Sequence, residues 1–158
     1  MQLAVKAALA RTPVPGDPAM RALGGAVIGT PALARSPEGA PAFWLVPLEI
    51  RARTCGFARV ELSGVVAQVG SFGAGTEDTS SWPEADFFRR PPARVLDEVR
   101  AKHAGAPLAE PMLSFDASPA KWAWRVAVGE PVSSVVYITP GGWYERPSPR
   151  AMRPGREG

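Results

Sequence analysis

Residues 121–128 read K-W-A-W-R-V-A-V, and their side chains alternate between two kinds. One set is wholly apolar and comprises Trp122, Trp124, Val126 and Val128. The other set mixes small and cationic residues and comprises Lys121, Ala123, Arg125 and Ala127. Successive side chains of a β-strand point to opposite faces, so the stretch predicts a strand whose apolar set faces the core. Residues 43–50, F-W-L-V-P-L-E-I, predict a second such strand, with an apolar set of Trp44, Val46, Leu48 and Ile50.

The two predicted strands follow nearly the same turn sequence. Residues 36–44 read S-P-E-G-A-P-A-F-W and residues 114–122 read S-F-D-A-S-P-A-K-W, which share the pattern S-x-(acid)-x-x-P-A-x-W. Aligned without a gap, residues 36–64 and their counterparts have five identical pairs, where average residue frequencies give roughly two. We interpret the similarity as an internal repeat, with the Ser and the acidic residue capping a turn and the Trp entering the central strand.

Each copy predicts a helix followed by antiparallel strands. In the second copy, Pro91-Pro92 precede R-V-L-D-E-V-R-A-K-H-A-G, which has apolar residues at helical spacing and Gly105 as a C-cap. Its predicted strands are 108–115, 121–128, 134–139 and, after a Pro-Gly-Gly turn, 143–145. The first copy predicts a weaker helix near 17–25 and strands at 43–50, 57–62 and 65–70.

The expected fold is therefore α+β: two α-β-β-β(-β) repeats that join into one largely antiparallel sheet with helices on one face. The expected domains are a first repeat at 1–72, a linker at 73–90, a second repeat at 91–145, and a basic, flexible tail at 146–158.

Composition and charge narrow the class of function. The chain has 158 residues, of which 46% are hydrophobic, and can bury a core. The formal charge of +3 lies in the tail, which holds four arginines against Glu157. A nucleic-acid site needs basic residues on a folded face, so we expect no nucleic-acid partner. No apolar stretch is long enough to span a bilayer, so no membrane partner is expected.

Cysteine usage indicates the compartment. The single cysteine, Cys55, cannot form an internal disulfide, which favours a cytoplasmic location. Secretion is the alternative, because an apolar run at 22–34 follows Arg21.

A candidate binding surface lies on the second face of the predicted sheet. Side chains of adjacent strands that share this face mix aromatic anchors with arginines, a composition that is common in protein-binding surfaces. The candidate residues are Phe43, Leu45, Phe57, Arg59, Arg125, Tyr137 and Tyr144. We expect this face to be open; the alternative is that the C-terminal segment or residues 1–16 cover it.

Catalytic patterns are weaker. Ser118 and Lys121 have the S-x-x-K spacing of acyl-enzymes, but they precede a strand where such enzymes have a helix. Cys55 and His103 form a thiol–imidazole pair only if the fold brings them together. One His, one Cys and no acidic cluster at ligand spacing predict no metal site, and no cofactor is expected.

Two families share this layout. The segment G-F-A-R-V-E-L-S-G-V-V (56–66) resembles the strand–turn–strand of PepSY-type propeptide domains. The tandem helix-plus-sheet arrangement is similar to that of the beta-lactamase inhibitor protein family, which relies on disulfides that one cysteine cannot supply. Both resemblances imply polypeptide binding without catalysis.

The sequence thus predicts a non-enzymatic module that binds a peptide or protein on its open sheet face or along an exposed edge strand. Two alternatives remain: a small hydrolase or transferase that uses Cys55 or Ser118, and a self-assembling subunit such as a homodimer.

Overall fold

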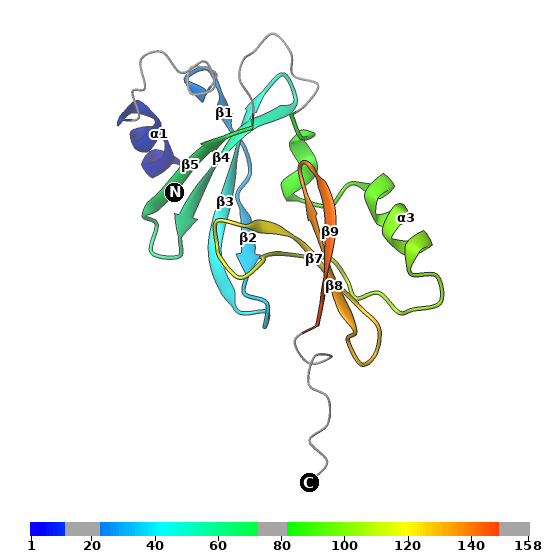
Figure 1. The fold of residues 1–158 in the computed structure, drawn as a ribbon. Helices are drawn as coiled ribbons and strands as arrows, with labels where there is room; N and C mark the ends of the chain where they lie inside the picture. Colours follow the sequence, from blue (N-terminus) through cyan, green and yellow to red (C-terminus); the bar gives the residue numbers. More distant parts are fainter. Residues whose placement is uncertain (12–22, 73–81, 149–158) are drawn as a thin grey trace. The chain divides into compact units, whose positions relative to one another are not determined.

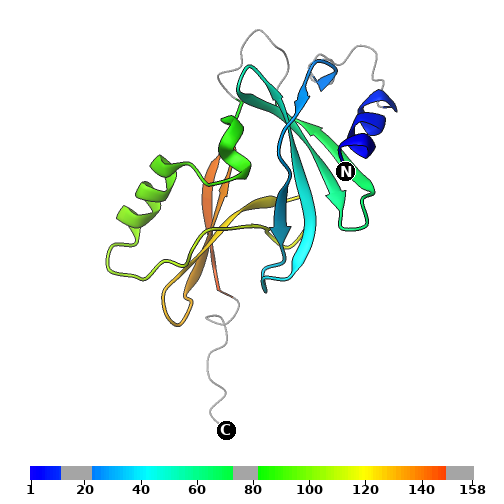
Figure 2. The ribbon, with the colours of Figure 1, turned by 180° about the vertical axis from the view of Figure 1, so that it is seen from behind.

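The computed structural model describes residues 1–11, 23–72 and 82–148. The chain divides into two compact units, each built around its own sheet (Figures 1 and 2). Unit 1 comprises Met1–Ala34 and Ala40–Arg89, and unit 2 comprises Arg35–Gly39 and Arg90–Gly158. The prediction of a mixed α+β fold with antiparallel strands is confirmed.

Unit 1 contains a five-stranded sheet in the order β1-β3-β4-β5, with β2 also paired with β3. The strands are β1 (Val27–Ile28), β2 (Ala32–Arg35), β3 (Pro41–Ile50), β4 (Arg53–Glu61) and β5 (Val66–Ser71). β3 and β4 form a hairpin whose turn residues Arg51 and Ala52 have positive φ angles of 51° and 58°. Gly64, with a φ of 92°, occupies the turn between β4 and β5.

Among the described residues, unit 1 has one α-helix, α1 (Gln2–Arg11), which packs beside β5 (Figure 1). Val5 and Leu9 of α1 join the core that forms on the predicted apolar face of β3 and on the matching face of β4. Most of the helix expected near 17–25 lies outside the described residues. A helix covers the apolar face, as expected. This helix is α1, which forms from an Ala-rich segment where the sequence predicted neither a helix nor a strand.

Part of the expected linker, 73–90, belongs to the folded core of unit 1, which corrects that assignment. The Trp82 side chain is buried in the same cluster as Val46 and Leu48. The Thr54 amide donates a hydrogen bond to the Pro83 carbonyl (2.9 Å), and a 3-10 helix, η1 (Ala85–Phe88), follows and packs against β3. The apolar W-P-x-x-x-F-F pattern explains the difference, because a solvated linker would not carry three large aromatic side chains.

Unit 2 contains α3 (Ala93–Lys102) and a four-stranded antiparallel sheet in the order β6-β7-β8-β9. The strands are β6 (Met112–Phe115), β7 (Trp122–Val128), β8 (Ser134–Thr139) and β9 (Gly142–Pro147). The helix predicted after Pro91-Pro92 is confirmed, and its buried residues are Val95 and Val99.

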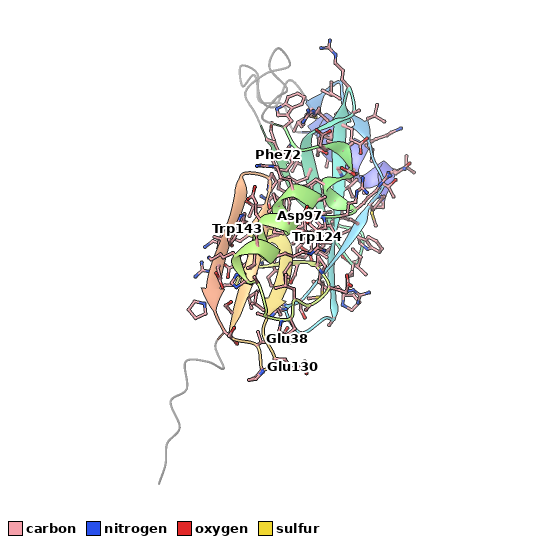
Figure 3. The ribbon with its side chains drawn as sticks, turned by 90° about the vertical axis from the view of Figure 1, so that its right-hand side faces the viewer. Glu38, Phe72, Asp97, Trp124, Glu130 and Trp143 are labelled. Carbon is pink, nitrogen blue, oxygen red and sulfur yellow. The ribbon has the colours of Figure 1, made fainter. Side chains whose placement is uncertain are left out.

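The register of unit 2 defines two faces of its sheet. Trp124 lies opposite Ile138, which lies opposite Trp143, and this row is on the same face as α3. Figure 3 shows α3 in front of the sheet with Trp124 and Trp143 beside it. Arg125, Tyr137 and Tyr144 form a row on the opposite face, which we call the helix-free face of unit 2.

Two parts of the expected architecture need correction, and a third remains a prediction. The described strands form two separate sheets, where the sequence suggested one joined sheet. Arg146 lies within β9, so the strand extends beyond the expected start of the tail at 146. The internal repeat stays a prediction.

The packing of α1 generates a stability prediction. Val5→Ala should lower the free energy of unfolding of unit 1 by about 2 kcal/mol, because Val5 is fully buried and the substitution leaves a cavity. Leu3→Ala, on the same helix, removes a side chain that is 83% exposed. This control should change the free energy of unfolding by less than about 0.5 kcal/mol. Urea unfolding of both variants measures the difference, and equal effects would show that α1 does not dock on the sheet.

Candidate functional site

The residues of the predicted open face in unit 1 are buried. Phe43, Leu45 and Phe57 expose 1%, 0% and 8% of their surface. The Phe57 ring lies 5.6 Å from the Phe72 ring, centroid to centroid, and against Gly70, where a Cβ would come within 2.7 Å of it. The expectation of an open aromatic surface is therefore wrong for unit 1, because these side chains already pack against protein.

Arg59 also has partners within unit 1. Its guanidinium carbon lies 5.6 Å from the centre of the Phe43 ring, and its Nη1 lies 3.2 Å from Glu61 Oε1. Leu45 pairs with Arg59 and Phe43 with Glu61 across β3 and β4, so the candidates of unit 1 share one face of the sheet as predicted. The arginine thus covers a buried aromatic ring and pairs with its own strand.

The three candidates of unit 2 lie together in one row. Arg125 pairs with Tyr137 across β7 and β8, and Tyr137 pairs with Tyr144 across β8 and β9. The two tyrosine rings are stacked, with centroids 5.4 Å apart and an interplanar angle of 22°. Tyr137 is buried, Arg125 is half-buried, and Tyr144 is 36% exposed. Of the seven predicted site residues, only Tyr144 is exposed.

A buried carboxylate holds the exposed end of this row. The Asp116 side chain is 7% exposed. Its Oδ2 accepts a hydrogen bond from Tyr144 Oη (3.0 Å) and forms an ion pair with Arg146 Nε (2.7 Å). The Arg146 guanidinium carbon also lies 5.7 Å from the centre of the Tyr144 ring. The turn between β6 and β7 therefore reaches across the helix-free face. There it fixes Tyr144 and Arg146, two neighbouring side chains of β9 on that face. Burial, followed by the nearby Asp116 carboxylate, raises the pKa of Tyr144 to about 12.

A second polar cluster fixes β9 from the α3 side. Glu145 Oε2 lies 2.8 Å from Lys102 Nζ and 3.5 Å from His103 Nε2, and Ser134 Oγ donates a hydrogen bond to Glu145 Oε1. The hydrogen bonds from Lys102 and Ser134 lower the pKa of Glu145. Lys102 Nζ also lies 4.9 Å from the centre of the Trp143 ring. Side chains on both faces thus hold β9 in a fixed position.

The outer side of β9 remains unpaired in the part of the chain that the structure describes. β9 is the last strand in the sheet order. The Ser148 amide donates to the Ser133 carbonyl, and antiparallel pairing alternates, so residues two and four positions earlier also direct their backbone groups toward β8. The N–H and C=O groups of Trp143 and Glu145 consequently point away from the sheet. We call these four groups the β9 edge.

The candidate nucleophiles have environments that do not favour catalysis. Cys55 is fully buried, its thiol donates to the Leu48 carbonyl (3.1 Å), and burial raises its pKa to about 11. A protonated, inaccessible thiol is a poor nucleophile. Cys55 belongs to unit 1 and His103 to unit 2, and His103 is oriented toward Glu145.

Ser118 lies in the turn before β7 and not at the start of a helix, as its sequence context predicts. Its Oγ accepts a hydrogen bond from the Ala120 amide (3.3 Å), and its carbonyl accepts one from the Lys121 amide (2.8 Å). The contacts of Ser118 therefore stabilise the turn that also contains Asp116.

Two further features concern the described residues as a set. Within 1–11, 23–72 and 82–148, no three His, Cys, Asp or Glu side chains are grouped so that they could bind a metal ion. None of the described helices has the length and apolar character needed to cross a membrane.

Comparison of the chain with protein-family models, curated proteins and solved structures finds no match. The candidate site therefore rests on the geometry of unit 2.

Several residues of the candidate site around β9 were not predicted as site residues from the sequence. Asp116 was assigned to turn capping, Arg146 to a flexible tail, and Trp143 and Glu145 only to a short strand. The signal that could have found them is the alternation of W-Y-E-R after the Pro-Gly-Gly turn, which places two aromatic and two charged residues on one strand.

The environment of Cys55 predicts slow thiol chemistry. At neutral pH, a rise in pKa from 9 to about 11 lowers the thiolate fraction about a hundredfold, and burial slows access further. Native protein should therefore react with a disulfide reagent such as DTNB at least about a hundredfold more slowly than urea-unfolded protein. Equal rates in the two states would contradict the buried position of Cys55.

The Asp116 contact predicts a change in the titration of Tyr144. Asp116→Asn should lower the pKa of Tyr144 from about 12, because the phenolate would no longer face a carboxylate. An NMR titration with ¹³C-labelled tyrosine measures this pKa directly. Glu130→Gln, which removes an exposed carboxylate of the same unit, is the matched control and should leave the titration unchanged. An unaltered pKa in the Asp116 variant would remove that residue from the site.

Proposed function

We propose that this protein is a non-enzymatic module that binds a polypeptide in an extended conformation along β9. The observation that carries the proposal is the β9 edge, whose outward N–H and C=O groups have no described partner. Such an edge offers main-chain hydrogen bonds to an added strand.

The side chains of β9 suit this role. Trp143 and Tyr144 provide aromatic surface on the two faces of the strand, and Lys102 and Arg146 lie against their rings. Aromatic residues and arginine are enriched in protein-binding surfaces. A polypeptide strand added to β9 would therefore contact an aromatic–cation pair on each face.

The rigidity of β9 supports binding with a low entropic cost. Asp116 holds Tyr144 and Arg146 on one face, and Lys102 and Ser134 hold Glu145 on the other. A preorganised strand loses little conformational freedom when its partner arrives. The resemblances to PepSY-type domains and to the beta-lactamase inhibitor protein family imply the same class of function, polypeptide binding without catalysis.

The proposal keeps the edge-strand alternative of the sequence-based expectation and does not use the open sheet face. The predicted face contributes Tyr144 as its exposed member, while Phe43, Leu45, Phe57 and Tyr137 are buried. Binding along the strand edge uses backbone groups that no residue-type pattern can identify.

Glu145→Pro tests the proposal, because proline removes an N–H of the β9 edge without removing a hydrogen bond to β8. Glu145→Ala is the matched control: both variants lose the Glu145 carboxylate, but the alanine variant keeps the N–H. A peptide selected against the wild-type protein from a random display library serves as the probe, with affinity measured by fluorescence polarisation.

We expect the proline variant to bind this peptide about tenfold more weakly than the alanine variant, since one hydrogen bond is lost and the ring obstructs the edge. Hydrogen exchange should also show protection of the Trp143 and Glu145 amides when the peptide is bound. Equal affinity of the two variants, with no such protection, would reject the β9 edge as the binding site.

A further inference from the structure

We propose that the polypeptide that pairs with β9 is a second copy of this chain, antiparallel, with Tyr144 opposite the Tyr144 of the second copy. This inference rests on the proposed function, because it names the partner of the same β9 edge.

The hydrogen-bonding phase of β9 is self-complementary in this register. With the two-fold axis at Tyr144, Trp143 of each copy lies opposite Glu145 of the other. Trp143 and Glu145 are the two residues of β9 that direct both an N–H and a C=O outward, so each facing pair exchanges both of its hydrogen bonds. The β9 edge is then fully used by both copies.

The neighbouring registers are less favourable. A two-fold axis at Glu145 would place two carboxylates opposite each other, and would set Trp143 against Pro147, which has no N–H to donate. An axis at Trp143 would set Glu145 against Gly141, which belongs to the turn before β9 and not to the strand. The axis at Tyr144 avoids all three conflicts.

The side chains on the helix-free face match across this axis. Tyr137 and Tyr144 are stacked within one copy, so facing Tyr144 side chains would extend the aromatic row into the second copy. Directly opposite aromatic residues stabilise antiparallel pairs. Arg146 would face Gly142, which has no side chain, so its guanidinium could keep its contact with Asp116.

The charges on the α3 face are also complementary. Lys102 lies over the Trp143 ring, and the pairing brings Glu145 of the second copy opposite that Trp143. Each copy thus offers an ammonium group beside the carboxylate of the other. By two-fold symmetry the contact occurs twice.

Sedimentation velocity over a range of protein concentrations tests the inference. The wild-type protein and Glu145→Ala should both show a monomer–dimer equilibrium. The dimer of Glu145→Pro should dissociate at least about tenfold more readily than that of Glu145→Ala, because each copy loses one edge donor.

Disulfide trapping tests the register and does not depend on the proline variant. Position 144 of one copy would lie opposite position 144 of the second copy in a non-hydrogen-bonded pair. The distance between the two positions is one that a disulfide can span. Tyr144→Cys should therefore form a covalent dimer under mild oxidation. Arg146→Cys is the matched control: it lies on the same face of β9, but its counterpart would be four positions away along the paired strands, beyond the reach of a disulfide. The native Cys55 is buried and contributes no background.

A monomer at every protein concentration overturns the inference. Equal dimer dissociation constants for Glu145→Pro and Glu145→Ala also overturn it. Equal yields of covalent dimer from Tyr144→Cys and Arg146→Cys do the same. Each of these outcomes leaves the proposed function to its own test. If the wild-type protein is a monomer but the selected peptide protects the β9 amides, the second copy is the wrong partner and the β9 edge is the right site.

Discussion

The central strands β3 and β7 carry buried side chains on both faces, and the arrangement of each unit follows from this constraint. In β7, Trp122, Trp124 and Val126 are buried on the α3 side, and Ala123 is buried on the other. In β3, Val46 and Leu48 face the core under α1, while Phe43 and Leu45 are buried on the opposite face. A strand that is covered on both sides leaves only the strands at the rim of the sheet available for contact with other molecules.

This double burial explains why polar contacts concentrate on β9. The helix-free face of unit 2 has a small apolar centre of Ala123, Val135 and Tyr137, and Asp116 secures its outer part by binding Tyr144 and Arg146. A buried carboxylate needs such partners, because desolvation without compensation is costly. The result is a rim strand held on both faces, whose remaining backbone groups are exposed to solvent or to a partner.

Local patterns were sufficient to predict several elements. Alternation located β3 and β7, the Pro-Pro pair and the helical spacing located α3, and the turn residues separated the following strands. The same alternation placed Arg125 and Tyr137 on one face of the sheet, where they are cross-strand neighbours. These features depend on residues close in sequence, and there the spacing of apolar residues distinguishes a strand from a helix.

Other features depend on contacts that local patterns do not encode. The Ala-rich α1 has no clear apolar stripe, and it is ordered by packing on the sheet. The contact of Asp116 with Tyr144 joins residues 28 positions apart. An open face was expected because a helix covers only one side of each predicted sheet. Phe43, Leu45 and Ala123 on the other side are nevertheless buried.

The two polar clusters that hold β9 also make their contribution to its stability depend on pH. The pKa of Glu145 is lowered in the folded protein, so its stabilising contribution is present above its ordinary value of 4.5 and disappears as acid protonates it. The pKa of Tyr144 is raised from 10 to about 12, so its contribution is complete below pH 10 and disappears as the phenol ionises. Acid therefore loosens β9 from the α3 side, and alkali loosens it from the helix-free side. Detachment at either extreme would expose the backbone groups of β8 and move the free rim of the sheet inward by one strand.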